Sequence, residues 1–257
     1  MKFAGIIPSR YASSRFPGKP LADLWGKPMI QWVYERALEV FPESLWVATD
    51  DERIVEAVRG FGGQVVLTSS EHRSGTDRCG EALEKIGGEF DVVVNVQGDE
   101  PFVHPAQLRV LKACFSDETT QIATLVKALG RGEEATKTLF NPNVPKVVVN
   151  RKGDAIYFSR AAIPYIRGKE PDEWTSMQVY YTHIGIYAYR YEVLRELIQL
   201  PAGDLETAES LEQLRWIEHG YTIRAGITEI ESFGIDTPED YARALNQSII
   251  HQTLLQQ

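Results

Sequence analysis

A long polar loop follows the first apolar stretch of the sequence and carries three cations. It runs from Pro8 to Pro20 and contains Arg10, Arg15 and Lys19 among small residues. Guanidinium groups offer planar donor pairs to phosphate oxygens, and an ammonium adds a compact charge. The loop has neither the Walker pattern nor the G-x-G-x-x-G dinucleotide fingerprint. We therefore predict a phosphate-binding loop of a different nucleotide fold, with a solvated loop of scattered charges as the alternative.

Two aspartates stand where a carboxylate could hold a metal ion. Asp99 follows Gly98, just after an apolar stretch of the kind expected for a buried strand. Asp236 directly precedes Thr237, the cap of the last predicted helix. Mg²⁺ takes oxygen ligands and bridges substrate phosphates. Each residue also has an ordinary reading, a Gly-Asp turn for Asp99 and a favourable helix dipole for Asp236. If they lie together, they would form a carboxylate cage for one or two Mg²⁺ ions.

Other polar residues fall into three short clusters whose roles the residues alone leave open. The clusters are Ser74 with Thr76 and Arg78, His183 with Tyr187, and Glu209 with Gln213. The spacing of the last pair predicts one shared helical face, since residues four apart are neighbours on a helix. A lone histidine in an apolar strand is more often a core residue, and a Glu–Gln helical face is usually solvated.

Short apolar stretches alternate with segments of helical period in the first half of the chain. The expected strands cover 3–8, 45–49, 65–68 and 91–96, and the expected helices cover 29–41, 52–61 and 76–86. This βαβ alternation predicts a layered α/β fold with a parallel sheet. Ligands bind at the carboxyl ends of such strands, so the polar segments after Pro8, Thr68 and Val96 are the expected site.

The second half is less regular and predicts a mixed extension of the sheet. Strands are expected at 121–127, 146–150, 155–159 and 182–189, helices at 192–200 and 206–219, and a loop around 167–174. The last helix begins with Thr237 as its cap, Pro238 in its first turn and Asp240 three residues after the cap.

Composition excludes several classes of protein. The chain has 257 residues, 43% hydrophobic, and a net charge of −9, which offers phosphodiester backbones no general attraction. We expect no nucleic-acid partner. No apolar run reaches the roughly 20 residues of a membrane span, and the start is too short for a signal-peptide core, so we expect a cytoplasmic protein without a membrane partner. Cys79 and Cys114 lack metal-ligand spacing and are expected to be ordinary core or helix residues.

Eight segments together resemble the 3-deoxy-manno-octulosonate cytidylyltransferases. They are 10–21, 74–78, 95–101, 141–143, 157–160, 183–187, 211–215 and 234–240. The opening loop and the Gln-Gly-Asp-Glu-Pro turn occur broadly among nucleotide-sugar synthetases. The His-Ile-Gly-Ile-Tyr and Leu-Glu-Gln-Leu-Arg segments of the second half are narrower signals for this family.

The resemblance implies a Rossmann-like, mainly parallel sheet of the glycosyltransferase-A type with helices on both faces. It also implies a homodimer that uses CTP, Mg²⁺ and the acidic sugar 3-deoxy-manno-octulosonate (Kdo) to make CMP-Kdo for lipopolysaccharide. We expect one domain over 1–257. Its nucleotide-binding half would cover about 1–130, its sugar-binding and dimerisation half about 131–230, and a closing helix 237–257.

Residue roles follow from the resemblance together with the clusters above. Catalytic roles are expected for Arg10, Arg15, Lys19, Asp99 and Asp236, of which the two aspartates would be the metal ligands. The nucleotide is expected to contact Pro8, Ser9, Arg10, Arg15, Lys19, Ser74, Thr76, Arg78 and Gln97. The sugar is expected to contact Arg160, His183, Tyr187, Glu209 and Gln213. Two alternatives stay open: a nucleotidyltransferase for a related acidic or amino-modified sugar, and a nucleotide-binding regulatory protein without turnover.

Overall fold

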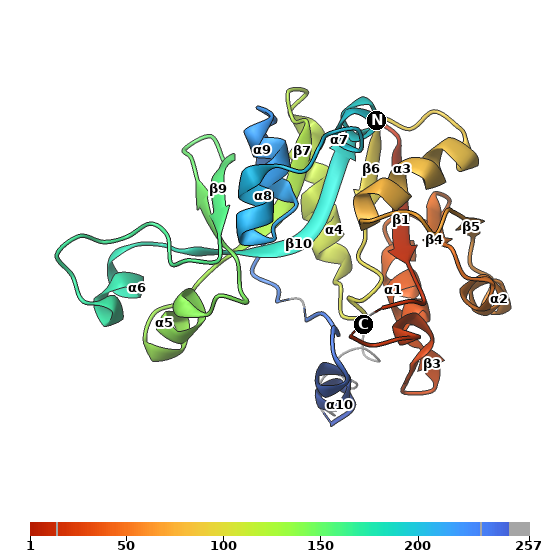
Figure 1. Cartoon of the computed structure of the whole chain (residues 1–257), viewed down its shortest axis with the longest axis horizontal. Coiled ribbons are helices and arrows are strands. Elements are labelled where there is room, and N and C mark those ends of the chain that lie inside the picture. Colours follow the sequence, from red (N-terminus) through yellow and green to blue (C-terminus); the bar gives the residue numbers. More distant parts are fainter. Residues whose placement is uncertain (14, 232, 247–257) are drawn as a thin grey trace. The chain divides into compact units, whose positions relative to one another are not determined.

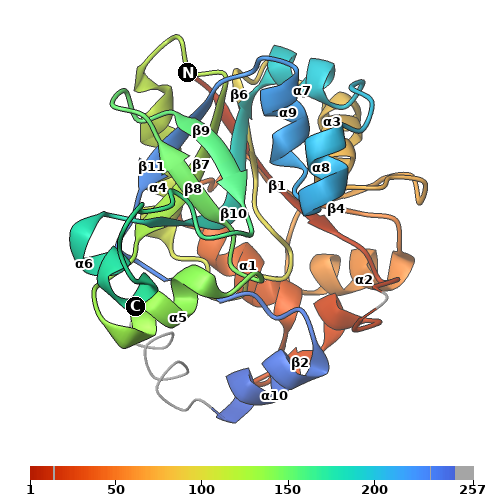
Figure 2. The ribbon, with the colours of Figure 1, turned by 60° about the vertical axis from the view of Figure 1, so that its left-hand side comes forward.

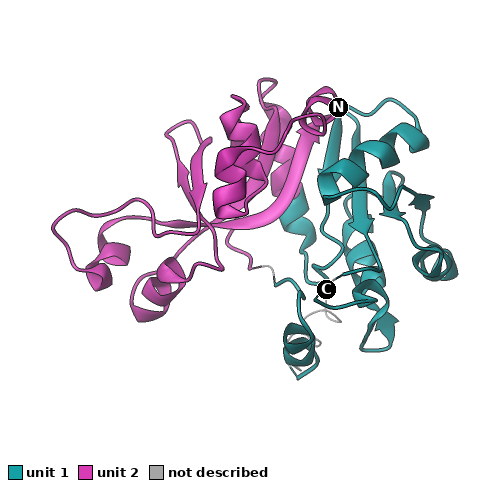
Figure 3. Cartoon of the chain, viewed as in Figure 1, with its two compact units in different colours: residues 1–108, 232–257 teal, residues 109–231 magenta. Residues whose placement is uncertain are grey.

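The computed structural model describes residues 1–13, 15–231 and 233–246, and the chain divides into two compact units (Figure 3). Unit 1 combines residues 1–108 with the C-terminal segment, and unit 2 contains residues 109–231. One folding domain can contain two such units, so the single domain remains a prediction.

Unit 1 is built on four parallel strands in the order β6-β1-β4-β5. These strands are β1 (Phe3–Ser9), β4 (Leu45–Thr49), β5 (Val65–Leu67) and β6 (Val92–Asn95). The helices between them are α1 (Met29–Leu38), α2 (Glu52–Gly60) and α3 (Gly75–Ile86) (Figure 1). The short elements η1 (Lys19–Leu21), β2 (Asp23–Leu24) and β3 (Lys27–Pro28) lie between β1 and α1, and α4 (Pro105–Ala113) spans the boundary of the units.

The unit 1 sequence specifies these elements through burial and capping. Ile6 in β1 and Val93 in β6 are fully buried, as expected for parallel strands covered on both faces. Asp51 caps α2, and Ser74 caps α3 in a reciprocal capping box with Asp77. Local signals therefore fix where α2 and α3 begin.

The C-terminal helix α10 (Pro238–Asn246) packs on unit 1 through an apolar cluster. Ala244 belongs to this cluster, with Leu24, Trp32 and Ile235. The predicted cap is confirmed, because the Thr237 hydroxyl accepts a hydrogen bond from the Asp240 amide. The rest of the helix predicted for 237–257 lies outside the described residues.

Unit 2 contains a mixed sheet. Its strands are β7 (Ile122–Ala128), β8 (Lys146–Val149), β9 (Ala155–Ser159), β10 (Tyr181–Arg190) and β11 (Ile223–Ile227). Strand β7 pairs with β11 in parallel and with β10 antiparallel, while the β8–β9 hairpin pairs with β10 (Figure 2). The helices are η2 (Cys114–Ser116), α5 (Glu133–Phe140), η3 (Pro171–Glu173), α6 (Trp174–Met177), α7 (Tyr191–Leu197), α8 (Asp204–Glu209) and α9 (Gln213–Glu218).

Two predictions for unit 2 are wrong. The helix predicted for 206–219 is two helices, because Ser210 takes a left-handed conformation with φ 51° that ends α8. The loop predicted around 167–174 contains η3 and leads into α6, which begins at the buried Trp174. The sequence analysis also missed α4, α5 and β11.

The predicted α/β class with a mainly parallel sheet is confirmed. Within the described part of the chain, no helix is long and apolar enough to cross a membrane. Cys79 is buried in α3 and Cys114 lies partly buried in η2, and the two cysteines form no disulfide. Burial raises the pKa of the Cys114 thiol, which fits the predicted structural role.

Candidate active site

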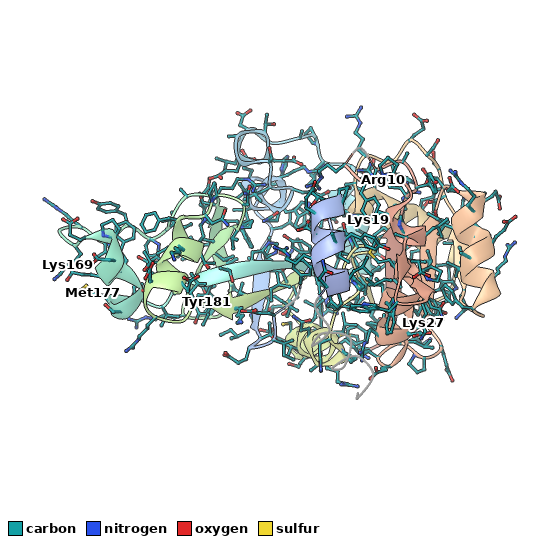
Figure 4. The ribbon with its side chains drawn as sticks, turned by 90° about the horizontal axis from the view of Figure 1, so that it is seen from below. Arg10, Lys19, Lys27, Lys169, Met177 and Tyr181 are labelled. Carbon is teal, nitrogen blue, oxygen red and sulfur yellow. The ribbon has the colours of Figure 1, made fainter. Side chains whose placement is uncertain are left out.

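A pocket of ≈190 Å³ lies in unit 1, where the loops after β1, β5 and β6 meet. Its lining residues are Pro8, Ser9, Arg10, Ser13, Arg15, Lys19, Pro20, His72, Arg73, Ser74, Gly75, Arg78, Gln97, Gly98, Asp99 and Asp236. Figure 4 shows Arg10 and Lys19 near each other on this unit. The pocket lies at the strand ends that the sequence pattern indicated.

Asp99 and Asp236, 137 positions apart in the sequence, meet at one ammonium group. Lys19 Nζ lies 2.8 Å from Asp99 Oδ2 and 3.3 Å from Asp236 Oδ1. The Arg15 guanidinium adds a second contact, 3.2 Å from Asp236 Oδ1. The Lys19 side chain is only 10% exposed, whereas the carboxylates are 34% and 46% exposed, so both acids remain open to the pocket.

The backbone fixes the distance between the two aspartate-bearing segments. The Ile235 amide donates a 2.9 Å hydrogen bond to the Asp99 carbonyl oxygen, which ties the turn after β6 to the entry of α10. At Gly98, an added Cβ would lie 2.7 Å from the Pro8 carbonyl oxygen. Only glycine lets the Asp99 turn approach the end of β1 this closely.

The pocket lining is positive although the whole chain is acidic. It contains the five cations Arg10, Arg15, Lys19, Arg73 and Arg78, against the carboxylates Asp99 and Asp236. The chain as a whole carries a net charge of −9. A local excess of cations in an acidic protein suits a polyanionic small molecule.

Most residues predicted for the nucleotide line this pocket, with one exception. Ser9 Oγ is buried at its wall and has no hydrogen-bond partner among the described residues, as expected for a group that meets a ligand or water. Arg78 donates to Thr68 Oγ1 at 2.6 Å and contacts Asp50 at 3.4 Å, so part of its charge is already paired. Thr76 is buried and does not line the pocket.

The sequence analysis missed several lining residues, including His72 and Arg73. His72 is hydrogen-bonded through Nε2 to Glu81. Burial opposes ionisation of Glu81, but hydrogen bonds from Lys85, the Ser69 amide and His72 outweigh it and lower the pKa of Glu81 to about 2. The only sequence signal was the position of these residues, directly before the capping segment that starts at Ser74.

In unit 2, His183 and Tyr187 lie together on β10. A β-bulge shifts the register between Ile184 and Tyr187, and the two rings are 5.3 Å apart. His183 Nε2 lies 2.9 Å from Thr124 Oγ1. His183 is a partly buried residue, and burial lowers its pKa to about 3 and raises the pKa of Tyr187. His183 is therefore neutral near pH 7 and can act through hydrogen bonds but not as a cation.

Arg160 and Glu209 are both engaged by their own surroundings. The Arg160 guanidinium donates to the backbone oxygens of Pro142, Glu209 and Ser210, at 3.1, 2.6 and 3.2 Å. The Glu209 carboxylate accepts from Ser159 Oγ at 2.6 Å and from the Arg160 amide at 2.9 Å. These contacts hold the β9 end to the break between α8 and α9. Sugar binding by the two residues stays a prediction.

Gln213 is not on a common helical face with Glu209, because the helix is broken between them. Its side-chain Nε2 is buried without a hydrogen-bond partner among the described residues, as is the Tyr187 hydroxyl. Buried polar atoms are normally hydrogen-bonded, so both are candidates to meet a polar ligand or water.

Asp99 and Asp236 bring two carboxylates together, which fits part of the ligand set of a magnesium ion. Both carboxylate oxygens face the Lys19 ammonium, and carboxylate oxygens are ligands that Mg²⁺ prefers. Among the residues that the structure describes, no group of three or more acidic, histidine or cysteine side chains forms a fuller metal site. Phosphate oxygens and water would complete the coordination, as is usual for Mg²⁺.

Comparison with known proteins identifies close relatives over almost the whole chain. The family described as Cytidylyltransferase matches residues 4–244. A 3-deoxy-manno-octulosonate cytidylyltransferase of Parabacteroides distasonis is 62% identical over 245 residues, covering 95% of this chain and 97% of that protein. One of the same name from Bacteroides thetaiotaomicron is 59% identical over 244 residues, with coverage of 95% and 97%.

Solved structures of cytidylyltransferases are also similar to this chain. A CMP:2-keto-3-deoxy-manno-octonic acid synthetase complexed with CTP has a TM-score of 0.89 and 43% identity, covering 98% of this chain and 100% of that one. A cytidylyltransferase from Leptospira borgpetersenii has a TM-score of 0.62 at 16% identity, covering 95% and 85%, and this likeness concerns the fold alone.

Proposed function

Since the chain belongs to the family of 3-deoxy-manno-octulosonate cytidylyltransferases, we propose that it transfers CMP from CTP to Kdo, releasing pyrophosphate, to supply CMP-Kdo for lipopolysaccharide. The observation that carries this proposal is the meeting of Lys19, Asp99 and Asp236 at a pocket rich in cations. A triphosphate requires cations around its leaving group, and a divalent metal on its phosphates requires carboxylates beside them.

In the proposed reaction, the anomeric hydroxyl of Kdo loses its proton to solvent water, and its oxygen forms a bond to the α-phosphorus of CTP. The bond from that phosphorus to the bridging oxygen breaks, and pyrophosphate takes the electron pair. Arg10, Arg15 and Lys19 neutralise charge on the departing phosphates. The chain forms no covalent intermediate, so its contribution is orientation and charge neutralisation.

We place Mg²⁺ on Asp99 and Asp236. Bound there, the ion would polarise the α-phosphate and lower the pKa of the attacking hydroxyl. Lys19 contacts both carboxylates, and the phosphates of CTP would offer that ammonium a second set of oxygens. Lys19 therefore has a defined partner both before and after nucleotide binding.

We assign the nucleotide to unit 1 and the sugar to His183, Tyr187 and Gln213 of unit 2. The orphaned Tyr187 hydroxyl and Gln213 amide support this, because sugar hydroxyls would satisfy them. A neutral His183 suits a hydroxyl partner better than a carboxylate partner. Arg160 and Glu209 support the same region through the hydrogen bonds that they already make.

We also propose a homodimer that works in the cytoplasm. Exposed apolar side chains gather in the α5–α6 region of unit 2, beyond Tyr181 at the start of β10; Figure 4 shows Met177 at this end. Tyr165 and Met177 are 72% and 54% exposed. Large apolar side chains that are exposed together are typical of a surface that contacts another protein. Sedimentation should show a dimer that Met177→Asp weakens, whereas Leu67→Asp, at an exposed apolar position of unit 1, leaves it intact.

The experiment that tests the activity is pyrophosphate release with Mg²⁺ and Kdo, comparing CTP with UTP and ATP and omitting each substrate in turn. Release that requires both CTP and Kdo is the expected result. Release with another acidic or amino-modified sugar, but not with Kdo, would favour the sugar alternative. If the chain bound CTP but released no pyrophosphate with any sugar, the result would favour a regulatory protein.

A further inference from the structure

An arginine outside the pocket stacks on the phosphate-binding loop. The guanidinium carbon of Arg53 lies 3.3 Å from the centre of the Tyr11 ring, a close cation–π contact. Arg53 is the second residue of α2, and Tyr11 follows Arg10 in the loop after β1. Neither Tyr11 nor Arg53 lines the pocket. The contact therefore joins the loop to a rigid element without touching the site directly.

Asp51 fixes the plane of this guanidinium. Its carboxylate accepts from Arg53 Nε at 2.9 Å and from a terminal Arg53 nitrogen at 2.6 Å. The same carboxylate caps α2 by accepting from the Arg53 amide at 3.0 Å. This hydrogen-bonded pair lowers the pKa of Asp51 and raises that of Arg53. The first turn of α2 thus presents a flat, oriented cation to the loop.

On the other side of the stack, Tyr11 organises the loop itself. Its carbonyl oxygen accepts hydrogen bonds from the amides of Ser13 and Gly18, both at 2.9 Å. Gly18 has φ +72°, and an added Cβ would lie 3.0 Å from the Tyr11 hydroxyl oxygen. The ring therefore rests on Gly18, and the next residue is Lys19, which holds Asp99 and Asp236.

We propose that Asp51, Arg53 and Tyr11 are positioning residues that hold the phosphate-binding loop in the conformation that binds the triphosphate of CTP. This inference rests on the proposed function. The oriented cation of α2 restrains the Tyr11 ring. The ring restrains Gly18, and with it the backbone that carries Lys19. A preformed loop spends less conformational entropy on nucleotide binding, so the stack contributes to affinity for CTP and not to recognition of the sugar.

The test is the dissociation constant for CTP, measured by calorimetry with Mg²⁺, together with the Michaelis constants for CTP and Kdo. Tyr11→Leu and Arg53→Met should each weaken CTP binding by about two- to fivefold, with the Michaelis constant for Kdo unchanged. Tyr11→Phe keeps the ring and should bind CTP like the unchanged chain. The matched control is Arg59→Met, which removes an exposed arginine from the last turn of the same helix.

The double variant separates a stack from two independent effects. Tyr11→Leu combined with Arg53→Met should bind CTP no more weakly than the worse single variant, because either change alone removes the contact. Unchanged CTP binding in Arg53→Met, or fully additive losses, would overturn the inference. Binding needs no turnover, so a chain that bound CTP but released no pyrophosphate with Kdo would contradict the proposed function while this test still stood.

Discussion

The residues assigned to the nucleotide and those assigned to the sugar differ in how the protein holds them. Around Lys19 in unit 1, charged side chains pair with one another, and both aspartates remain about one-third to one-half exposed. In unit 2, Arg160 is tied to backbone carbonyls and His183 is neutral and packed. The first arrangement can exchange partners when a charged ligand arrives. The second consists of side chains held by hydrogen bonds and packing, with a few buried polar atoms that have no hydrogen-bond partner among the described residues.

This difference matches what each substrate demands. A triphosphate brings several negative charges, and a site of partly exposed ion pairs can accept them by exchanging one anion for another. A sugar brings mostly hydroxyls, for which fixed neutral donors and acceptors discriminate better than charges. Changes in unit 1 should therefore alter charge chemistry, and changes in unit 2 should alter packing and recognition.

The largest expected effect comes from Asp99→Asn. The amide keeps the shape of the side chain but removes its charge from the Lys19 pair and from the proposed metal site. Turnover should fall by about a hundredfold or more. The melting temperature should change little, because the carboxylate is partly exposed. Steady-state rates at saturating Mg²⁺ and a thermal melt measure both quantities.

The matched control is Asp172→Asn, which removes an exposed carboxylate from unit 2. It should leave turnover unchanged. A near-normal rate in Asp99→Asn would show that Asp99 is not a catalytic residue. It would also contradict the claim that charge chemistry distinguishes unit 1 from unit 2.

Gly98→Ala should come next, with a loss of about 1–3 kcal/mol in the free energy of unfolding. The new methyl group would lie 2.7 Å from the Pro8 carbonyl oxygen, so the turn that carries Asp99 must move. Urea unfolding measures the loss, and turnover should fall with it. Gly60→Ala is the control, because a Cβ there meets nothing within 4 Å. Equal stability of both variants would show that the close approach is not needed.

A smaller effect, visible only in acid, is expected from His183→Gln. The unfolded chain takes up a proton on this histidine as the pH falls below about 6.5, while the folded chain, with a pKa of about 3, does not. Stability is therefore lost as the pH falls, by about 2 kcal/mol at pH 5. Between pH 7 and pH 5, the free energy of unfolding of the variant should therefore fall by about 2 kcal/mol less than that of the unchanged chain. Urea unfolding at the two pH values measures this difference. An unchanged pH dependence would mean that His183 is not held neutral by burial.

Much of unit 1 could be predicted because its signals are local. The βαβ alternation located the strands, Thr237 marked the start of the last helix, and strand ends indicated where Asp99 would stand. The meeting of Lys19 with Asp236 is a tertiary contact. Sequence could suggest it only through residue types that suit a metal site.

Other features had no sequence signal, for physical reasons. Nothing in a serine signals the left-handed conformation that ends α8 at Ser210, a position where glycine or asparagine is the usual marker. The resemblance assigns Arg160 to the sugar, which stays a prediction, and sequence could not show that the carbonyls of Pro142 and Ser210 already engage its guanidinium. The stack of Arg53 on Tyr11 joins two elements through a ring face, which has no sequence pattern.

The most direct test of the account is one kinetic comparison of two variants, Arg15→Ala in unit 1 and Gln213→Met in unit 2. Michaelis constants for CTP and Kdo would be measured in both. We predict that Arg15→Ala raises the constant for CTP alone and that Gln213→Met raises the constant for Kdo alone. If the constant for Kdo rose in Arg15→Ala, or that for CTP in Gln213→Met, the assignment of the two substrates to the two regions would be contradicted.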